Sequence, residues 1–252
     1  MAILYVAAEA AELKPFARRL GDTRKLKWPL DYACEGVLQG RRVMLTANGA
    51  GPRLAAQAVE VAIRAISAAE LSSSKLEAVV STGFCGALDR ALGLGGLVIG
   101  TAVLDRASGE TLKCAVVEDS IGDAIRRGVI VSEDRIANSA SDKELLAAFG
   151  ALAIEMEASG VAARANKAGI PFCCIKVVSD CCDESFGFDL NRMRTTEGRI
   201  ARGKIVSYAL THPKLVPELI RLRKRSERAA EALGDFLVSC RIKPESDSSL
   251  AE

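Results

Sequence analysis

Two segments of the chain carry carboxylates directly after apolar runs, where a buried strand would end. Residues 151–157 bring Glu155 and Glu157 out of such a run, and residues 173–180 end in Asp180. A carboxylate at the edge of an apolar segment costs free energy unless it is paired, hydrogen-bonded or protonated. In open α/β sheets, ligands bind beyond the carboxyl ends of the strands. These acids are therefore candidates for acid–base chemistry, although Glu157 could favour a helix N-terminus and Asp180 could cap a turn.

Composition excludes several other classes. The 252 residues include 34 Lys and Arg against 32 Asp and Glu, and this balance argues against a nucleic-acid binder. A single histidine, His212, leaves no basis for a Ser-His-Asp triad or a His-rich metal site. The eight cysteines follow an N-terminus without an export signal, so we expect reduced thiols in the cytoplasm. We expect neither a metal nor an organic cofactor.

Apolar runs that alternate with helical segments predict an α/β fold. We expect a single domain over residues 1–240, with a twisted mixed β-sheet flanked by helices, and a flexible tail over 241–252. The expected strands are 3–8, 32–38, 41–47, 77–82, 96–105, 111–117, 128–132, 152–156 and 172–178. The expected helices are 9–20, 53–69, 142–149, 158–168, 198–210 and 213–238. A glycine-containing turn is expected over 82–86.

The acidic segments resemble the purine nucleoside phosphorylase and nucleosidase superfamily, and are most similar to the methylthioadenosine/S-adenosylhomocysteine nucleosidases. Matching blocks are residues 3–13, 48–56, 81–96 and 154–180. The most specific element is Glu155-Met156-Glu157-Ala158, followed by Pro171-Phe172 and then Ser179-Asp180. The family breaks the N-glycosidic bond between a purine and ribose. The resemblance implies a small-molecule purine nucleoside as substrate, water or phosphate as the second substrate, and a homo-oligomer, with a dimer favoured.

The resemblance also implies roles for individual residues. Asp180 matches the acid that helps to protonate the purine at N7, and Glu157 matches the carboxylate that holds the ribose hydroxyls. Met156 packs against the sugar, and Glu12 matches the acid that activates water. Glu9 is either a second pocket acid or a solvated charge, and we favour the latter. Further substrate contacts are expected at Glu155, whose alternative role is only to bond backbone groups, and at Ile136, Phe84, Cys85 and Ser179.

Some positions depart from the family pattern. Phe84 stands where relatives often carry the serine that helps to hold phosphate, and Ser81 stands where hexameric relatives carry an arginine. We therefore favour hydrolysis of a 5′-substituted adenosine over phosphorolysis. Gly51 and Arg53, at the start of an expected helix, form either an alternative anion site or a solvated first turn.

The C-terminal third leaves alternatives open. Phe186 and Phe188 either cover an apolar 5′ group or fix the loop to the core. The basic helix over 213–238 presents either a solvated face or a membrane-surface contact. This ending resembles the hopanoid-associated phosphorylases, so the alternative function is phosphorolysis of an adenosylhopane-like lipid nucleoside. A nucleoside-binding protein without catalytic activity is the third reading.

Overall fold

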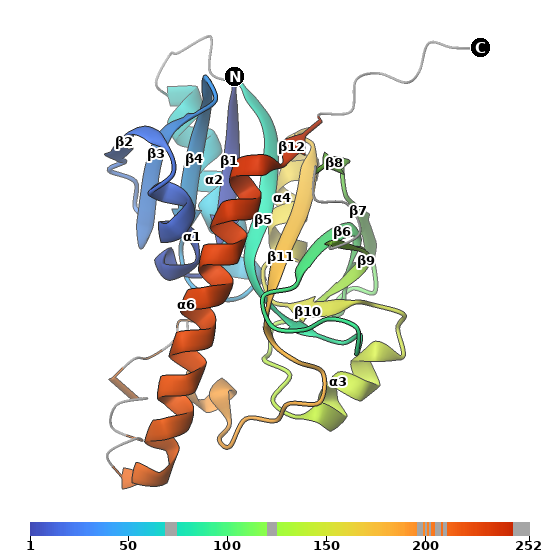
Figure 1. The fold of residues 1–252 in the computed structure, drawn as a ribbon. Coiled ribbons are helices and arrows are strands. Elements are labelled where there is room, and N and C mark those ends of the chain that lie inside the picture. Colours follow the sequence, from blue (N-terminus) through green and yellow to red (C-terminus); the bar gives the residue numbers. More distant parts are fainter. Residues whose placement is uncertain are drawn as a thin grey trace, which may run out of the picture.

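The computed structural model describes residues 1–68, 75–119, 125–195, 199, 201, 203–204, 208 and 211–243. A large mixed β-sheet forms its centre, and helices cover both faces (Figure 1). This arrangement confirms the α/β class and the mixed sheet expected from the sequence. Within the described ranges, no helix combines the length and the apolar composition needed to cross a membrane.

Within the described residues, ten strands form the sheet, in the order β10-β9-β6-β11-β5-β1-β4-β3-β2, with β7 paired to β6. They are β1 (Ala2–Ala7), β2 (Gly21–Lys25), β3 (Tyr32–Leu38), β4 (Arg41–Ala47), β5 (Leu76–Ala87), β6 (Leu97–Asp105), β7 (Thr111–Lys113), β9 (Ile125–Ser132), β10 (Ala153–Glu155) and β11 (Phe172–Asp180). Strands β4, β1, β5 and β11 run parallel to one another. Their carboxyl ends therefore meet at one edge, where ligands bind in folds of this type.

The sheet closes on itself at one end. Strand β10 pairs in parallel with β9 and antiparallel with β5, through Ala153 opposite Ala87 and Ile154 opposite Gly86. Strands β5, β11, β6, β9 and β10 consequently form a closed ring, which the sequence did not indicate. This closure places the end of β10, which carries Glu155, beside the end of β11, which carries Asp180.

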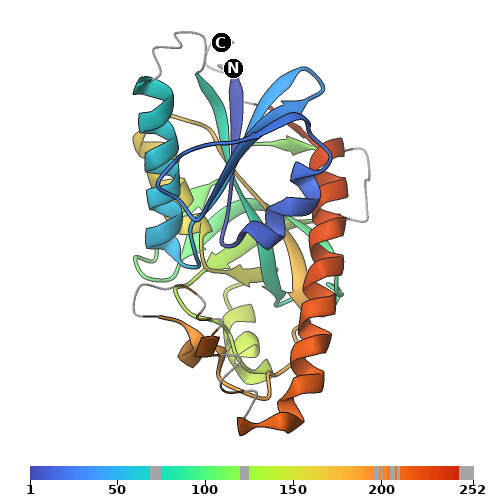
Figure 2. The same cartoon turned by 90° about the vertical axis from the view of Figure 1, so that its left-hand side faces the viewer.

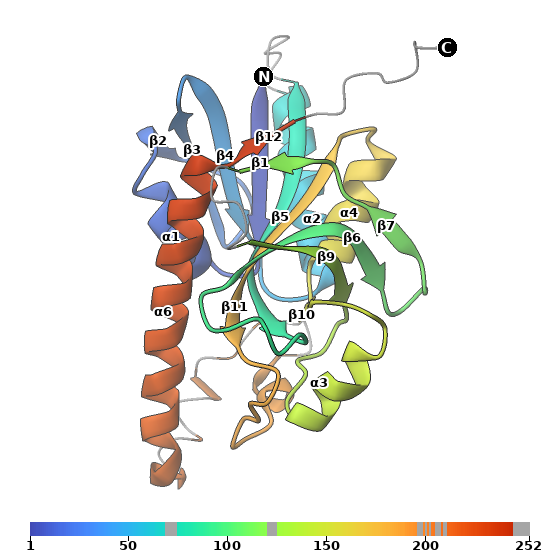
Figure 3. The ribbon, with the colours of Figure 1, turned by 45° about the vertical axis from the view of Figure 1, so that its right-hand side comes forward.

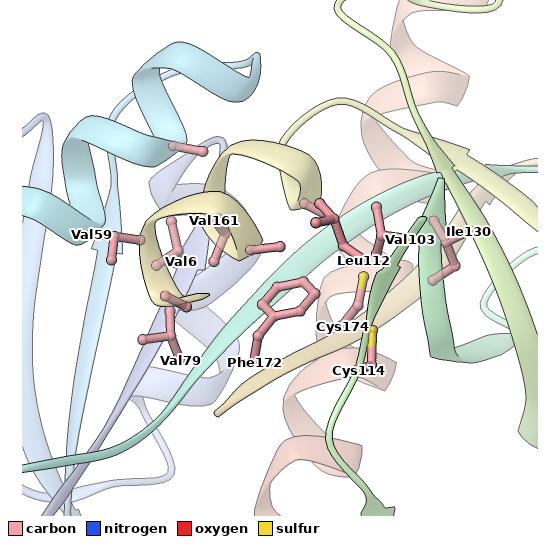
Figure 4. Packing of buried hydrophobic residues seen from close by; sticks show 14 of the residues in the cluster. Val6, Val59, Val79, Val103, Leu112, Cys114, Ile130, Val161, Phe172 and Cys174 are labelled. Carbon is pink, nitrogen blue, oxygen red and sulfur yellow. The ribbon is translucent and has the colours of Figure 1, made fainter. Parts of the chain in front are cut away.

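Helices α2 (Pro52–Ala68) and α4 (Ala158–Lys167) cover one face of the sheet, and α1 (Ala10–Ala17) and α6 (Val216–Ser239) cover the other (Figure 2). Under the first pair, Val59 of α2 and Val161 of α4 join a buried cluster with Val6, Val79 and Phe172 of the strands (Figure 4). Helix α3 (Ala140–Ala147) lies at the end of the molecule where β10 lies (Figure 3). Two short 3-10 helices, η2 (Leu190–Met193) and η3 (Pro213–Leu215), complete this end.

Strand β5 is longer than predicted, and the turn expected over 82–86 is wrong. The strand continues to Ala87 because β11 pairs with it as far as Gly86 and β10 pairs with Gly86 and Ala87. Gly83 has a φ of +116° inside this strand, and a side chain there would overlap with the Glu12 carboxylate. Glycine therefore allows the strand to pass directly beneath a candidate catalytic acid.

The remaining differences lie in short edge elements. Strand β2 is fully exposed and carries four polar residues in five, so no apolar alternation marked it. The predicted strand over 111–117 is divided into β7 and β8 (Val117–Glu118). Strand β12 (Arg241–Ile242) pairs with β8, and Ile242 is buried, so the flexible tail predicted from residue 241 is wrong at its start. The helix predicted over 198–210 lies largely outside the described residues.

Candidate active site

A cavity of about 300 Å³ lies where β1, β5, β10 and β11 end, and this volume is within the range of small-molecule sites. The structure places at its wall every residue predicted to catalyse the reaction or contact the substrate. These residues are Glu12, Phe84, Cys85, Ile136, Glu155, Met156, Glu157, Ser179 and Asp180. They come from segments that lie far apart in the sequence, and the sheet edge brings them together.

Glu12 reaches the cavity from the first turn of α1, directly after β1. It is 6% exposed, and the backbone N–H of Ala8 donates to its Oε2 at 3.2 Å. Burial raises the pKa of the Glu12 carboxyl to about 8, and the negative charge of Glu157 adds to the rise. Near neutral pH the unliganded site therefore holds a proton on Glu12.

Lys176 is a fully buried lysine beneath two of the acids. Its Nζ lies 2.7 Å from Glu155 Oε2 and 3.6 Å from Glu157 Oε2, and it donates to the carbonyl oxygen of Thr82 at 3.2 Å. Burial alone would lower the pKa of Lys176, but the two carboxylates raise it above its ordinary value. The lysine is therefore a fixed cation that offsets part of the negative charge around the cavity.

Glu155 serves mainly to hold the backbone. Its carboxylate accepts hydrogen bonds from the N–H groups of Glu157 and Ala158 at 2.9–3.0 Å, at the start of α4. This is the backbone role that the sequence left open for Glu155. Glu157 comes next, and its Oε1 accepts from the N–H of Gly51 at 3.1 Å. Burial raises the pKa of Glu157 above its ordinary value, while Lys176 opposes the rise.

Asp180 ends β11 and is 9% exposed. The Ser179 hydroxyl donates to its Oδ1 at 2.7 Å, and the ammonium group of Lys143 lies 2.6 Å from its Oδ2. Lys143 comes from α3 and does not line the cavity. Asp180 therefore faces the cavity on one side and a buried ion-pair partner on the other.

The two aromatic residues of the loop after β11 have different positions. Phe186 lines the cavity, as a residue that covers a 5′ substituent would. Phe188 is buried, with its ring 6.1 Å from the ring of Tyr208, so it fixes the loop.

Burial raises the pKa of the Cys85 thiol, which disfavours the thiolate that a cysteine nucleophile would need.

The alternative anion site at Gly51 and Arg53 is not part of this cavity and stays a prediction. The N–H of Gly51 donates to Glu157, and Arg53 is exposed and does not line the cavity. Glu9 lines the cavity and is half-buried, which supports a second pocket acid over the solvated charge that the sequence favoured. Within the described ranges, no group of three or more His, Cys, Asp or Glu side chains is arranged to hold a metal ion.

Sequence reasoning missed both buried lysines and the residues that α6 and η2 contribute. A lone lysine within the apolar run 172–178 was a usable signal for Lys176, because a buried ammonium requires carboxylate partners. Lys143 gave no such signal, because its segment has the composition of a solvated helix. The other missed residues that line the cavity include Arg135, Leu190, Arg194, Leu222 and Ser226.

Comparison with known proteins gives the class to which this fold and site correspond. The family model described as the phosphorylase superfamily matches residues 2–210. The chain therefore belongs to the phosphorylase superfamily.

Individual relatives share part of the sequence or the fold. The aminodeoxyfutalosine nucleosidase of Helicobacter pylori is 39% identical over 69 residues, which span 27% of this chain and only 30% of that protein. The 5′-methylthioadenosine/S-adenosylhomocysteine nucleosidase of Actinobacillus succinogenes is 26% identical over 212 residues, 74% of this chain and 89% of that protein. The solved structure of the corresponding nucleosidase from Neisseria meningitidis with methylthio-immucillin-A has a TM-score of 0.68 at 21% identity, covering 94% of this chain and 96% of that one. This last likeness shows the fold.

The raised pKa of Glu12 predicts that the difference in stability between the wild-type protein and Glu12→Gln depends on pH. The pKa of this carboxyl rises from 4.5 to about 8 on folding, so between these values the folded chain holds a proton that the unfolded chain releases. The contribution of Glu12 to the free energy of unfolding therefore falls as the pH rises through this window. Glu12→Gln cannot titrate, so it should gain stability relative to wild type between about pH 5 and about pH 8, measured by urea unfolding. A difference that stays constant with pH would contradict a buried, protonated Glu12.

Proposed function

We propose that this protein cleaves the N-glycosidic bond of a purine nucleoside. We propose hydrolysis of a 5′-substituted adenosine, of the methylthioadenosine or S-adenosylhomocysteine type, with release of adenine. The observation that carries the proposal is the convergence of Glu12, Glu157 and Asp180 on one cavity. The names of the two sequence relatives, both nucleosidases, support the same class of reaction.

Glycosidic cleavage needs one group to take a proton from the nucleophile and another to assist the leaving group. Asp180 assists the purine at N7. Glu12 accepts the proton of the attacking water in its ionised form, after releasing to solvent the proton that it holds near neutral pH. Glu157 holds the ribose hydroxyls, and Met156 packs against the sugar. Positive charge that develops on the ribose favours the ionised form of Glu12, which opposes the effect of burial on its pKa.

The charges around the cavity favour water over phosphate. Glu9 and Glu157 both line it, and carboxylates repel a phosphate dianion but not a neutral water molecule. The buried ammonium of Lys176 is already bonded to Glu155 and to the Thr82 carbonyl. Two arginines also line the cavity, but Arg135 pairs with Asp142 at 3.1 Å and Arg194 pairs with Asp134 at 2.6 Å.

Apolar side chains support a substrate with an apolar 5′ group. Phe186, Leu190 and Leu222 line the cavity from the loop after β11, from η2 and from α6. The loop is attached to α6, because Gly187 N–H donates to Glu218 at 2.9 Å and Arg225 pairs with Glu184 at 2.5 Å. A wall built in this way suits the methylthio group of methylthioadenosine better than the charged homocysteine chain of S-adenosylhomocysteine.

We further propose a homo-oligomer, with a dimer favoured, that works in the cytoplasm on small molecules and not on nucleic acid. Helix α6 has no buried residue before Ala229, and Val216 and Ile220 are 39% and 51% exposed. A subunit contact would remove this apolar area from water. The basic residues in the same half of α6 leave contact with a membrane surface as the alternative to contact with a second subunit. A monomer by light scattering would contradict the oligomer, and co-sedimentation with anionic liposomes would favour the membrane.

The reaction is tested by incubating the protein with methylthioadenosine in phosphate-free buffer and measuring released adenine. We expect release without phosphate, and no acceleration when phosphate is added. Glu12→Gln should lower the rate by about 10²–10⁴-fold, as expected for loss of a general base. Glu144→Gln, an exposed change on α3, is the matched control and should retain full activity.

Two other results would overturn the proposal. Release that requires phosphate would identify a phosphorylase, and adenosylhopane-like nucleosides would then be the substrates to test. Nucleoside binding without turnover across many purine nucleosides would identify a binding protein.

A further inference from the structure

Lys143 is a buried lysine for which the reaction outlined above has no role. It lies on α3, is 1% exposed, and does not touch the cavity. Its Nζ lies 2.6 Å from Asp180 Oδ2 and donates to the carbonyl oxygens of Cys181 at 2.6 Å and Glu184 at 3.3 Å. An ammonium group has three N–H bonds, and these three acceptors match them. The cation is therefore held at one position, directly behind the acid of the site.

The position of Asp180 Oδ2 connects this cation to the cavity. A Cβ atom at Gly86 would lie 2.9 Å from Oδ2, and Gly86 lines the cavity. The same carboxylate oxygen thus contacts Lys143 and lies next to the cavity wall. Burying a lysine is costly unless it is paired, and the carboxylate that pairs with Lys143 is the one proposed to face the purine.

We propose that Lys143 supplies, through Asp180, the proton that the departing purine receives. This inference rests on the proposed function. As the bond between C1′ and N9 breaks, its electron pair moves into the purine. One proton passes from Lys143 Nζ to Asp180 Oδ2 and from Asp180 to N7, which leaves Lys143 as a neutral amine. After the products leave, Glu12 releases to solvent the proton taken from the attacking water, and Lys143 regains a proton from solvent through Asp180, so that no net proton is gained or lost by the protein.

Lys143 is a positioning residue in this scheme, because it acts only through Asp180. Its bonds to the carbonyl groups of Cys181 and Glu184, and its distance of 5.7 Å from the centre of the Phe186 ring, would equally suit a purely structural role in holding the loop. The two roles differ in one respect. A proton source matters only when the leaving group needs a proton, whereas a misplaced loop affects every substrate.

The test compares two leaving groups on the same sugar. Adenine is released from methylthioadenosine, and 4-nitrophenolate, which leaves without a proton, is released from the matching 5-methylthio-riboside. Lys143→Met should lower kcat for adenine release by about 100-fold or more, with KM nearly unchanged, and should leave nitrophenolate release within about threefold. Lys143→Arg keeps the positive charge but does not give up a proton, so it should not restore adenine release. Lys167→Met, an exposed change on α4, is the control.

An equal loss with both leaving groups would overturn the proton-supply role. If Lys143→Met does not fold, Lys143→Gln takes its place, because it keeps a donor for the two carbonyl groups but has no ammonium proton to give.

A binding measurement separates this inference from the proposed function. In 9-deazaadenine N7 carries a hydrogen, whereas in adenine N7 is an acceptor. With Lys143 in place, the Asp180 carboxylate should accept the N7 hydrogen and bind 9-deazaadenine more tightly than adenine. Lys143→Met should reduce this preference by about tenfold or more, measured by calorimetry. An unchanged preference would overturn the inference.

A wild-type protein that binds both bases but cleaves no nucleoside would contradict the proposed function. The ratio of the affinities for the two bases would still decide the role of Lys143.

Discussion

The site depends on the ion pairs of one buried ammonium group. Lys176 is the cation among Glu12, Glu155 and Glu157, and carboxylates removed from water are costly unless charge or hydrogen bonds compensate them. Glu155 receives both the ammonium and two backbone N–H groups, so it is well compensated as an anion. Glu12 receives one backbone N–H, and burial leaves it with a raised pKa. The distribution of partners thus gives neighbouring glutamates different electrostatic surroundings.

The fold supplies this arrangement through close approaches of the backbone. The start of α4 lies against the start of α2, since Gly160 leaves no room for a side chain beside the carbonyl oxygen of Pro52. That contact brings the N–H of Gly51 to Glu157. On the other side, closure of the strand ring by β10 brings Glu155 within reach of Lys176 on β11. The site is therefore formed by the packing of whole elements, and no single loop contains it.

Local sequence was sufficient for some of these features and insufficient for others. The acids of residues 155–157 and Asp180 could be predicted because carboxylates after buried strands need a physical reason. Ring closure could not, because the three-residue β10 has no pattern that specifies two partners. The partner of Asp180 was also hidden, since Lys143 becomes buried only when α3 packs over the loop after β11. The alternatives for Gly51 and Arg53 could not be decided from local sequence, because the donation of the Gly51 N–H to Glu157 depends on how α4 packs against α2.

A crystal structure of the protein with methylthio-immucillin-A, the ligand of the Neisseria meningitidis nucleosidase, tests the central claim most directly. We predict that the base N7 lies within hydrogen-bond distance of Asp180, that the ring hydroxyl contacts Glu157, and that an ordered water lies between Glu12 and the carbon that corresponds to C1′. A ligand bound outside this cavity, or bound within it without contact to these three carboxyl groups, would contradict the account.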